Sequence, residues 1–187
     1  MYRALTWHAL RRGIDPHDES ALAQLAASAD VDVHEGRAGA SESTCVIIDG
    51  ADATAHLRDT DVEANVSLVS RVPGVRAALV RIQRALAANG RVVMAGRDIG
   101  TVVLPDADLK VYLDASREVR ARRRAGQLRA ANIEPDYDSL MRDLARRDGI
   151  DSTRAASPLT AAPGAVIINT DSLTVERVVE CIIEEAM

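Results

Sequence analysis

Apolar residues recur three and four positions apart along most of the chain, which is the spacing of one face of an α-helix. Asp18, Ser116 and Ser172 have side chains suited to capping the start of such a stretch, and Gly13 suits the end of one. The pattern predicts helices over about residues 1–12, 18–28, 61–72, 75–88, 116–131, 137–147 and 172–187. In the last helix the apolar residues form one stripe, which we expect to be buried: Val175, Val178, Val179, Ile182 and Ile183.

Shorter apolar runs between these helices have the lengths of strands. The strand candidates are residues 31–35, 44–48, 53–57, 91–95, 109–113 and 165–168. Asp49-Gly50 is a tight-turn signal between the second and third of them, which predicts a small antiparallel insertion. The last three runs alternate with helices. That alternation predicts an α/β fold with a parallel sheet covered on both faces.

The composition narrows the class of protein. The chain has 187 residues, 47% of them hydrophobic, and a formal net charge of −5, which is typical of a folded domain and not of a disordered chain or a basic nucleic-acid coat. Lys110 is the only lysine among 23 basic residues. Arginine-rich sequences reflect base composition in some genomes, but guanidinium groups also suit phosphate recognition, and both explanations stay open.

The composition and the apolar runs of the sequence argue against nucleic acids and membranes as partners. There is no phenylalanine, and the few aromatic residues offer no platform on which successive bases could stack, so we expect no nucleic-acid partner. No apolar run approaches the roughly 18 residues of a membrane span, and the first residues form no signal-peptide pattern. We therefore expect a cytoplasmic protein without a membrane partner, with Cys45 and Cys181 as free thiols.

One loop stands out as a candidate binding site. Gly96-Arg97-Asp98-Ile99-Gly100 follows the predicted strand at 91–95, and ligands of parallel sheets bind beyond the carboxyl ends of the strands. Arginines are concentrated further along the chain, at positions 120, 122, 123, 124, 146, 147 and 154. Such a run is often a solvated basic face. Three successive arginines on one helix also exceed the acidic partners available four residues away, so we expect some of them to find anions elsewhere.

Together these segments resemble bacterial cytidylate kinases. The resemblance is carried by Met1–Leu5, Ser67 with Val72–Arg76, Gly96–Ala107, Leu113–Ser116 and Arg147–Leu159, in the order and spacing of that family. It implies a single kinase-like domain over 1–187, of the nucleoside-monophosphate kinase (phosphate-loop) type. It also implies an inserted monophosphate-binding module at 30–60 and a helical lid at 117–135. The implied reaction is phosphoryl transfer from ATP, with Mg²⁺, to CMP or dCMP, by a protein that is monomeric when complete.

The resemblance also implies roles for individual residues. The residues that match substrate contacts are Arg3, Ser67, Arg76, Arg97, Asp98, Arg147 and Asp151. Those that match catalytic arginines are Arg123, Arg124 and Arg154, of which Arg154, like Arg3 and Arg97, also matches a group that grips the CMP phosphate. Ser67, Arg76 and Asp98 match groups that read cytosine, and Arg147 and Asp151 match groups at the sugar.

Elementary chemistry agrees with these roles. Phosphoryl transfer needs alignment and positive charge over the equatorial oxygens more than it needs covalent help. Cytosine offers an amine donor and ring acceptors, so Asp98 can accept while Arg76 and Ser67 donate. Each residue also has an ordinary structural explanation. Arg3 could lie on a surface, Ser67 could be a plain helix residue, and Asp151 could cap a loop.

The family's phosphate-loop pattern, G-x-x-x-x-G-K-[S/T], does not occur in these residues, because Leu104 stands six positions before Lys110, where a glycine would be required. In the family a strand, this loop and a helix precede the position of Met1, and that strand lies in the middle of the sheet. We therefore expect the 187 residues to carry the CMP half of the reaction, with no stable monomer and no enzymic turnover by themselves. The simplest interpretation is a start assigned at an internal methionine.

An alternative function is a non-catalytic CMP-binding or partner-dependent module that has lost ATP binding. A phosphate loop encoded in frame before Met1 would favour the kinase, and an in-frame stop would favour the module. The sequence does not decide whether CMP or dCMP is preferred, whether UMP is accepted, or how the chain assembles.

Overall fold

The computed structural model describes residues 1–35, 44–88, 90–130, 132–153 and 160–187. The chain divides into two compact units, Met1–Val92 and Val93–Met187. The prediction of a single domain is not tested by this division and stays a prediction. No helix of the described residues is long and apolar enough to cross a membrane.

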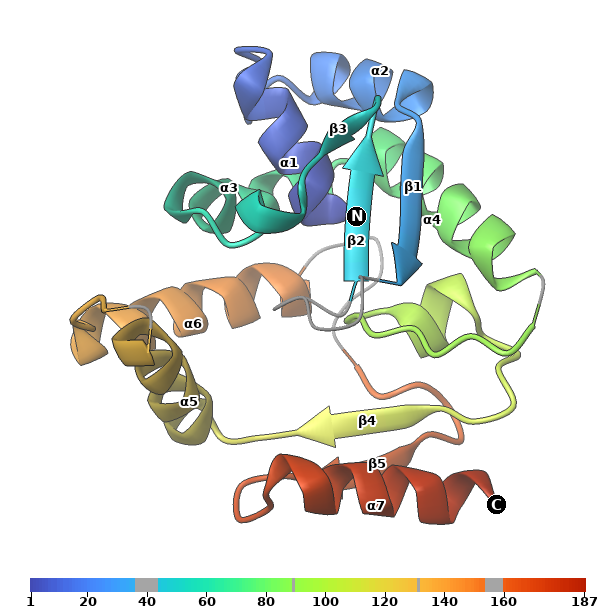
Figure 1. Ribbon diagram of the computed structural model, residues 1–187, viewed down its shortest axis with the longest axis vertical. Helices are drawn as coiled ribbons and strands as arrows, with labels where there is room; N and C mark the ends of the chain where they lie inside the picture. Colours follow the sequence, from blue (N-terminus) through green and yellow to red (C-terminus); the bar gives the residue numbers. More distant parts are fainter. Residues whose placement is uncertain (36–43, 89, 131, 154–159) are drawn as a thin grey trace. The chain divides into compact units, whose positions relative to one another are not determined.

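The first unit consists of helices packed against a small sheet (Figure 1). Its elements are α1 (Tyr2–Arg11), α2 (Glu19–Ser28), β1 (Val31–Glu35), β2 (Thr44–Ile48), β3 (Ala51–Asp52), a short 3₁₀ turn (Thr54–His56), α3 (Thr60–Arg71) and α4 (Pro73–Ala87). The fully buried side chains of its core come from four helices and one strand, and include Leu5, Leu22, Ile48, Val69 and Leu79. The four helices agree closely with the sequence prediction.

Local chemistry explains where these helices begin. The Asp18 carboxylate accepts a hydrogen bond from the Ala21 amide at 2.9 Å, which confirms Asp18 as the cap of α2. Pro73 is the first residue of α4, a position where the missing amide hydrogen costs nothing. Helices α2 and α4 pack together so closely that a Cβ on Gly74 would lie 2.5 Å from Ala23 Cβ. Glycine at position 74 is therefore a packing requirement.

The small sheet is antiparallel with the strand order β1-β2-β3, as the sequence predicts for this region. Asp49 and Gly50 adopt φ angles of 47° and 74°, which confirms the tight turn between β2 and β3. The predicted third strand at 53–57 is wrong: β3 ends at Asp52. The Asp52 carboxylate accepts from the Thr54 amide at 2.8 Å and turns the chain out of the sheet into the 3₁₀ turn.

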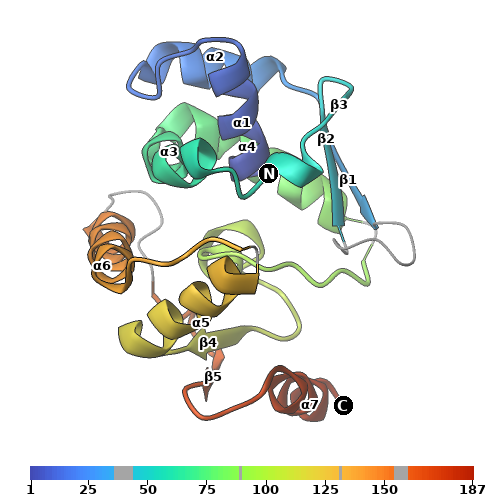
Figure 2. The same ribbon diagram turned by 60° about the vertical axis from the view of Figure 1, so that its left-hand side comes forward.

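The second unit combines helices with a two-stranded parallel sheet. Its elements are a π-helical turn (Ile99–Val103), β4 (Val111–Asp114), α5 (Arg117–Ala130), α6 (Tyr137–Thr153), β5 (Val166–Asn169) and α7 (Val175–Ala186). Val111 pairs with Val166 and Asp114 with Asn169, in parallel register. Helix α5 packs against α6 (Figure 2). The structure therefore confirms an α/β chain with a parallel sheet and a small antiparallel sheet.

The predicted strand at 91–95 is wrong, since these residues have no regular secondary structure. Arg91 adopts a φ of 54°, a left-handed conformation that interrupts an extended run at its first residue. Among the described residues β4 pairs with β5 and with no other strand, so the run has no partner for its backbone groups.

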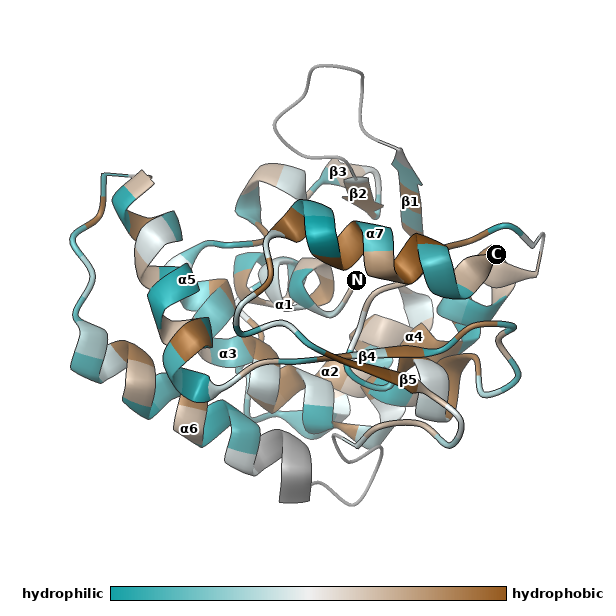
Figure 3. Ribbon diagram, turned by 90° about the horizontal axis from the view of Figure 1, so that it is seen from below, coloured by the Kyte–Doolittle hydropathy of each residue, from teal (hydrophilic) through white to brown (hydrophobic). Residues whose placement is uncertain are grey.

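The prediction of a buried apolar stripe on the last helix is also wrong. Helix α7 is capped by Thr174, whose hydroxyl accepts from the Arg177 amide at 3.3 Å, and not by Ser172. Val175, Val179 and Ile183 are about half exposed or more, at 75%, 48% and 53% (Figure 3 shows apolar and polar residues alternating along α7). Two strands span only about 5 Å, whereas a helix with its side chains is about 10 Å wide, so a two-stranded sheet cannot cover the stripe.

Candidate functional site

The candidate loop around Arg97 and Asp98 forms the entrance to a π-helical turn. The Asp98 carbonyl accepts hydrogen bonds from the amides of Val102 at 2.9 Å and Val103 at 3.2 Å. Asp98 itself is buried, with 6% of its surface exposed, whereas Arg97 is exposed. A Cβ on Gly96 would lie 2.8 Å from Ile99 Cγ1, so a larger residue there would have to displace the Ile99 side chain. Single π-helical turns are frequent at functional sites.

The structural element that holds this loop therefore differs from the one that the sequence predicts. No strand precedes it, and the π turn that follows it orders the backbone instead. The pairing of an exposed cation with a buried carboxylate is what a ligand with both a phosphate and a polar base requires. The sequence located these two residues but not the turn that holds them.

The start of α5 is tied to the segment after β5. Ser116 caps the helix as predicted, with its hydroxyl accepting from the Val119 amide at 3.3 Å. The Ser116 amide donates to the Asp171 carboxylate at 2.7 Å. These two hydrogen bonds fix the N-terminal end of α5, the helix that carries the arginines.

Two arginines of α5 form ion pairs with one carboxylate of α6. Arg120 donates from Nη1 and Nη2 to the two oxygens of Asp148, at 2.9 and 2.7 Å. Arg117 Nε lies 3.5 Å from Asp148 Oδ2. The hydrogen bonds from Arg120 lower the pKa of Asp148, and the same contact raises the pKa of Arg120. This pairing could not be predicted from the sequence, because the two residues are 28 positions apart.

The predicted lid arginines have different surroundings. Arg123 donates from Nη1 to the Thr170 hydroxyl at 3.0 Å and from Nη2 to the Thr170 carbonyl, directly after β5. Arg124 donates to Gln127 Oε1 at 3.3 Å along its own helix. Thr170 is buried, and its hydroxyl donates to the Asp114 carbonyl at 3.0 Å. Arg123 is thus fastened to the end of the sheet, an interaction that sequence reasoning missed.

The remaining residues of this unit lie on or after α6. Arg147 is half-buried and directly precedes Asp148. Asp151 belongs to the last turn of α6, but its side chain is outside the description. Arg154 lies outside the described residues altogether.

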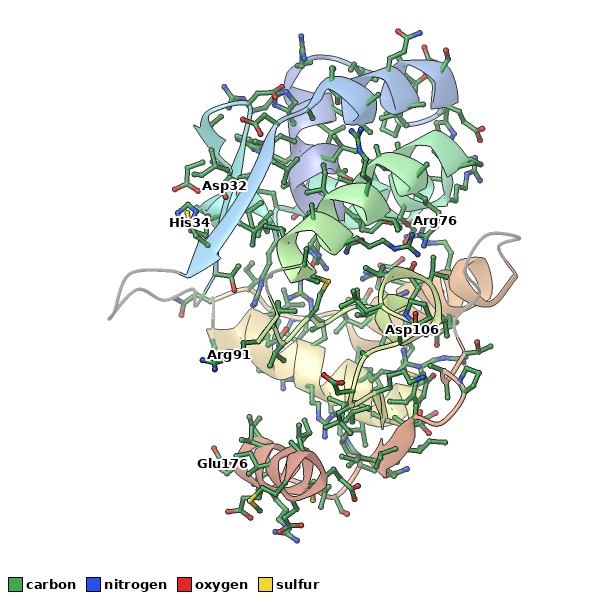
Figure 4. The ribbon with its side chains drawn as sticks, turned by 90° about the vertical axis from the view of Figure 1, so that its right-hand side faces the viewer. Asp32, His34, Arg76, Arg91, Asp106 and Glu176 are labelled. Carbon is green, nitrogen blue, oxygen red and sulfur yellow. The ribbon has the colours of Figure 1, made fainter. Side chains whose placement is uncertain are left out.

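The first unit holds three of the predicted contacts. Ser67 and Arg76 are both buried, each with 5% of its surface exposed. Arg76 donates from Nη1 to the Ser70 carbonyl at 3.2 Å, and its guanidinium lies 5.6 Å from the centre of the Tyr2 ring (Figure 4 labels Arg76 on α4). The Ser70 hydroxyl in turn donates to the Ser67 carbonyl at 3.2 Å. The Arg76 side chain and the Ser67 backbone carbonyl are therefore linked through Ser70.

Arg3 belongs to a separate contact in the same unit. Its Nη1 donates to the Leu57 carbonyl at 2.7 Å and to Glu63 Oε1 at 3.1 Å. About a third of the Arg3 side chain stays exposed, at 32%. The ion pair ties α1 to α3 and leaves part of the guanidinium accessible to an anion.

The described residues offer anion-binding groups but not a metal site. No cluster of three His, Cys, Asp or Glu side chains suited to a metal ion occurs in the part of the chain that the structure describes. Lys110 donates from Nζ to the Pro105 carbonyl at 3.0 Å. The arginines suit phosphate oxygens, and the buried Asp98 suits a hydrogen-bond donor on a base.

Comparisons with known proteins agree on one family. The family model described as "Cytidylate kinase" matches residues 1–187. A cytidylate kinase of Pelotomaculum thermopropionicum is 47% identical over 183 residues, which cover 98% of this chain and 80% of the relative. Cytidylate kinases of Corynebacterium glutamicum and Geobacillus kaustophilus are 46% and 47% identical over 184 residues, each covering 98% of this chain and 78% and 80% of the relative.

The matches do not support the prediction of a missing N-terminal strand and phosphate loop, which stays a prediction. Nor does any match favour the non-catalytic alternative. Three relatives share close to half of their aligned residues with this chain over nearly its whole length. The chain therefore belongs to the cytidylate kinase family and is a kinase.

Proposed function

We propose that this protein transfers the γ-phosphoryl group of ATP to CMP or dCMP. An oxygen of the monophosphate forms a bond to the γ-phosphorus, the bond from that phosphorus to the bridging oxygen of ATP breaks, and CDP or dCDP and ADP leave. The observation that carries the proposal is the buried Asp98 beside the exposed Arg97, in a chain of the cytidylate kinase family. That pair suits a substrate with an exocyclic amine and a phosphate.

In the second unit, we assign Asp98 to the base and Arg97 to the phosphate. A buried carboxylate accepts hydrogen bonds and cannot donate them when ionised, so it suits the cytosine amine and disfavours the carbonyl that uracil has at the same place. Arg147 and Asp151 would contact the sugar. Arg154 would contact phosphate, with Arg123 and Arg124 acting on the transferring group.

In the first unit, we assign Ser67 and Arg76 to the cytosine acceptors and Arg3 to the phosphate. Arg76 and Ser67 are supported by their burial, and the hydrogen bond from Arg76 to the Ser70 carbonyl restricts the orientation of the guanidinium before any ligand binds. Arg3 is supported by its partial exposure beside Glu63. A guanidinium already held by one carboxylate still has donors for a phosphate.

For Arg123 to act on the transferring phosphoryl group, its guanidinium has to exchange the Thr170 oxygens for phosphate oxygens. Such an exchange costs little, because charge-assisted hydrogen bonds to phosphate replace bonds to neutral oxygens. ATP with Mg²⁺ would be the donor. We assign none of the described residues of this chain to the metal.

Calorimetric titration with CMP, dCMP and UMP tests this function directly. The protein should bind CMP and dCMP, and UMP roughly 5- to 150-fold more weakly, the scale of one mismatched base contact. Asp98→Ala should weaken CMP binding by a similar factor. Asp106→Ala is the matched control, since Asp106 is exposed and follows the same π turn.

Two results would contradict the proposal. Equal binding of CMP and UMP would remove the cytosine-reading role of Asp98. CMP binding by the protein without any CMP-dependent release of ADP from MgATP would remove the transfer reaction itself.

A further inference from the structure

Asp148 forms an ion pair that joins the two long helices of the second unit. Both of its carboxylate oxygens accept from Arg120 of α5, at 2.9 and 2.7 Å, and Arg117 approaches one of them at 3.5 Å. A guanidinium that meets a carboxylate with two parallel hydrogen bonds fixes direction as well as distance. The pair therefore restrains how α6 is rotated and placed against α5.

On each helix, this ion pair stands close in sequence to residues that we assign to the substrate. On α6, Asp148 directly follows Arg147 and stands three residues before Asp151. On α5, Arg120 stands one turn before Arg123 and Arg124. The two members of the ion pair thus stand near, along their helices, the residues that we assign to the sugar and to the transferring phosphoryl group.

We propose that Asp148 is a positioning residue, which holds α6 and its Arg147 in place against α5 so that the sugar of the monophosphate is correctly seated. This inference rests on the proposed function. Asp148 itself need not touch the substrate, because both of its oxygens are occupied by Arg120. The lowered pKa of Asp148 agrees with a carboxylate that stays ionised in its pair at neutral pH.

Another ion pair of α6 provides a contrast. Arg146 Nη2 lies 3.4 Å from Asp143 Oδ1, but these residues are three positions apart on one helix, and both are about half exposed. Such a pair cannot restrain one helix against another, and exposed pairs of this kind contribute little. Asp143→Asn is therefore the matched control for Asp148→Asn: the same helix, the same chemical change and no link to α5.

The experiment measures CMP affinity of Asp148→Asn, Asp143→Asn and the unsubstituted protein by calorimetry, at a temperature where all three are folded. Asp148→Asn should bind CMP roughly 3- to 30-fold more weakly, the usual range for residues that act through others, and Asp143→Asn should bind it as before. Unchanged affinity in Asp148→Asn would overturn the proposal. So would tighter binding, which would mean that Asp148 only withholds Arg120 from the phosphate.

A double-mutant cycle separates positioning from a general loss of stability. Arg120→Gln should weaken CMP binding to the same extent as Asp148→Asn, and the double variant should be no weaker than either alone, because both remove the same link. Fully additive losses would overturn the proposal. If Asp148→Asn does not fold, Arg120→Gln and Arg117→Gln carry the test, since these side chains are about a third and nearly half exposed, at 35% and 44%.

The distance between the helices tests the inference independently of substrate. Spin labels at Arg122→Cys on α5 and Arg142→Cys on α6, with Cys45 and Cys181 replaced by serine, report that distance by pulsed electron spin resonance. Asp148→Asn should broaden or shift the distance distribution, and Asp143→Asn should leave it unchanged. An unaltered distribution overturns the positioning role. Failure of the unsubstituted protein to bind CMP would instead contradict the proposed function, and the distance measurement would still decide on Asp148.

Discussion

At the scale of single residues, the ion pair of Asp148 sets a pH dependence of stability. Arg120 holds the pKa of Asp148 below the ordinary value of about 3.9, so the folded state binds this proton less readily than the unfolded chain does. The stabilisation is therefore fully present above about pH 4 and is lost as the pH falls through the folded-state pKa. Because the pair is partly exposed, the effect is no larger than about 1 kcal/mol.

We expect the free energy of unfolding of the unsubstituted protein to exceed that of Asp148→Asn at pH 7, and the difference to shrink as the pH falls below about 4. Urea unfolding at pH 7, 5, 4 and 3 measures both proteins under the same conditions. A difference that stays constant over this range would show that the carboxylate contributes through packing and not through its charge.

Single residues also show what the sequence can and cannot reveal. Arg97 and Asp98 could be singled out because glycines on both sides mark a tight loop, and the structure buries Asp98 there. The partners of Arg120 and Arg123 could not, because Asp148 and Thr170 are 28 and 47 positions away. A local pattern of charged residues cannot predict contacts that depend on how helices and strands are arranged in space.

At the scale of elements, the packing of α2 on α4 depends on the absence of a side chain at Gly74. A Cβ there would lie 2.5 Å from Ala23 Cβ, a distance too short for two non-bonded carbon atoms. We expect Gly74→Ala to destabilise the protein by about 1–3 kcal/mol, the usual cost of overpacking, in spite of alanine's higher helix propensity. Chemical denaturation measures the change.

Two variants check that the cause is the contact and not the helix. Ala23→Gly should recover part of the loss when combined with Gly74→Ala, because it removes the atom that clashes. Gly126→Ala in α5 should stabilise by about 0.5–1 kcal/mol, since nothing lies within 4 Å of a Cβ at that position. Equal effects at positions 74 and 126 would contradict the packing explanation.

Elements were predicted well where local chemistry decides them. Asp18 and Ser116 cap the helices that they were expected to cap, and Asp49-Gly50 turns between two strands. The run at 91–95 and the stripe on α7 were predicted wrongly because apolar sequence does not say which partner is present. A strand needs a neighbour to pair with, and a helix face needs a surface wide enough to cover it.

At the scale of the whole molecule, the basic charge is carried almost entirely by guanidinium groups. Lys110 is the only lysine among 23 basic residues, and its ammonium donates to the Pro105 carbonyl. Every cation that we assign to CMP is an arginine, including Arg3 and Arg97. If these assignments are correct, a reagent that blocks amines should leave CMP binding intact, whereas a reagent that blocks guanidinium groups should remove it.

We expect acetylation of amines to leave CMP affinity unchanged, because no lysine contacts the monophosphate, and phenylglyoxal, which reacts with guanidinium groups, to abolish CMP binding. Bound CMP should protect a subset of arginines that includes Arg97, identified by peptide mass spectrometry, while exposed arginines such as Arg129 react in either case. Protection fits a phosphate held by planar, doubly donating groups. Uniform modification with and without CMP would instead mean that the high arginine content reflects base composition alone, and loss of binding on acetylation would place an amine at the site.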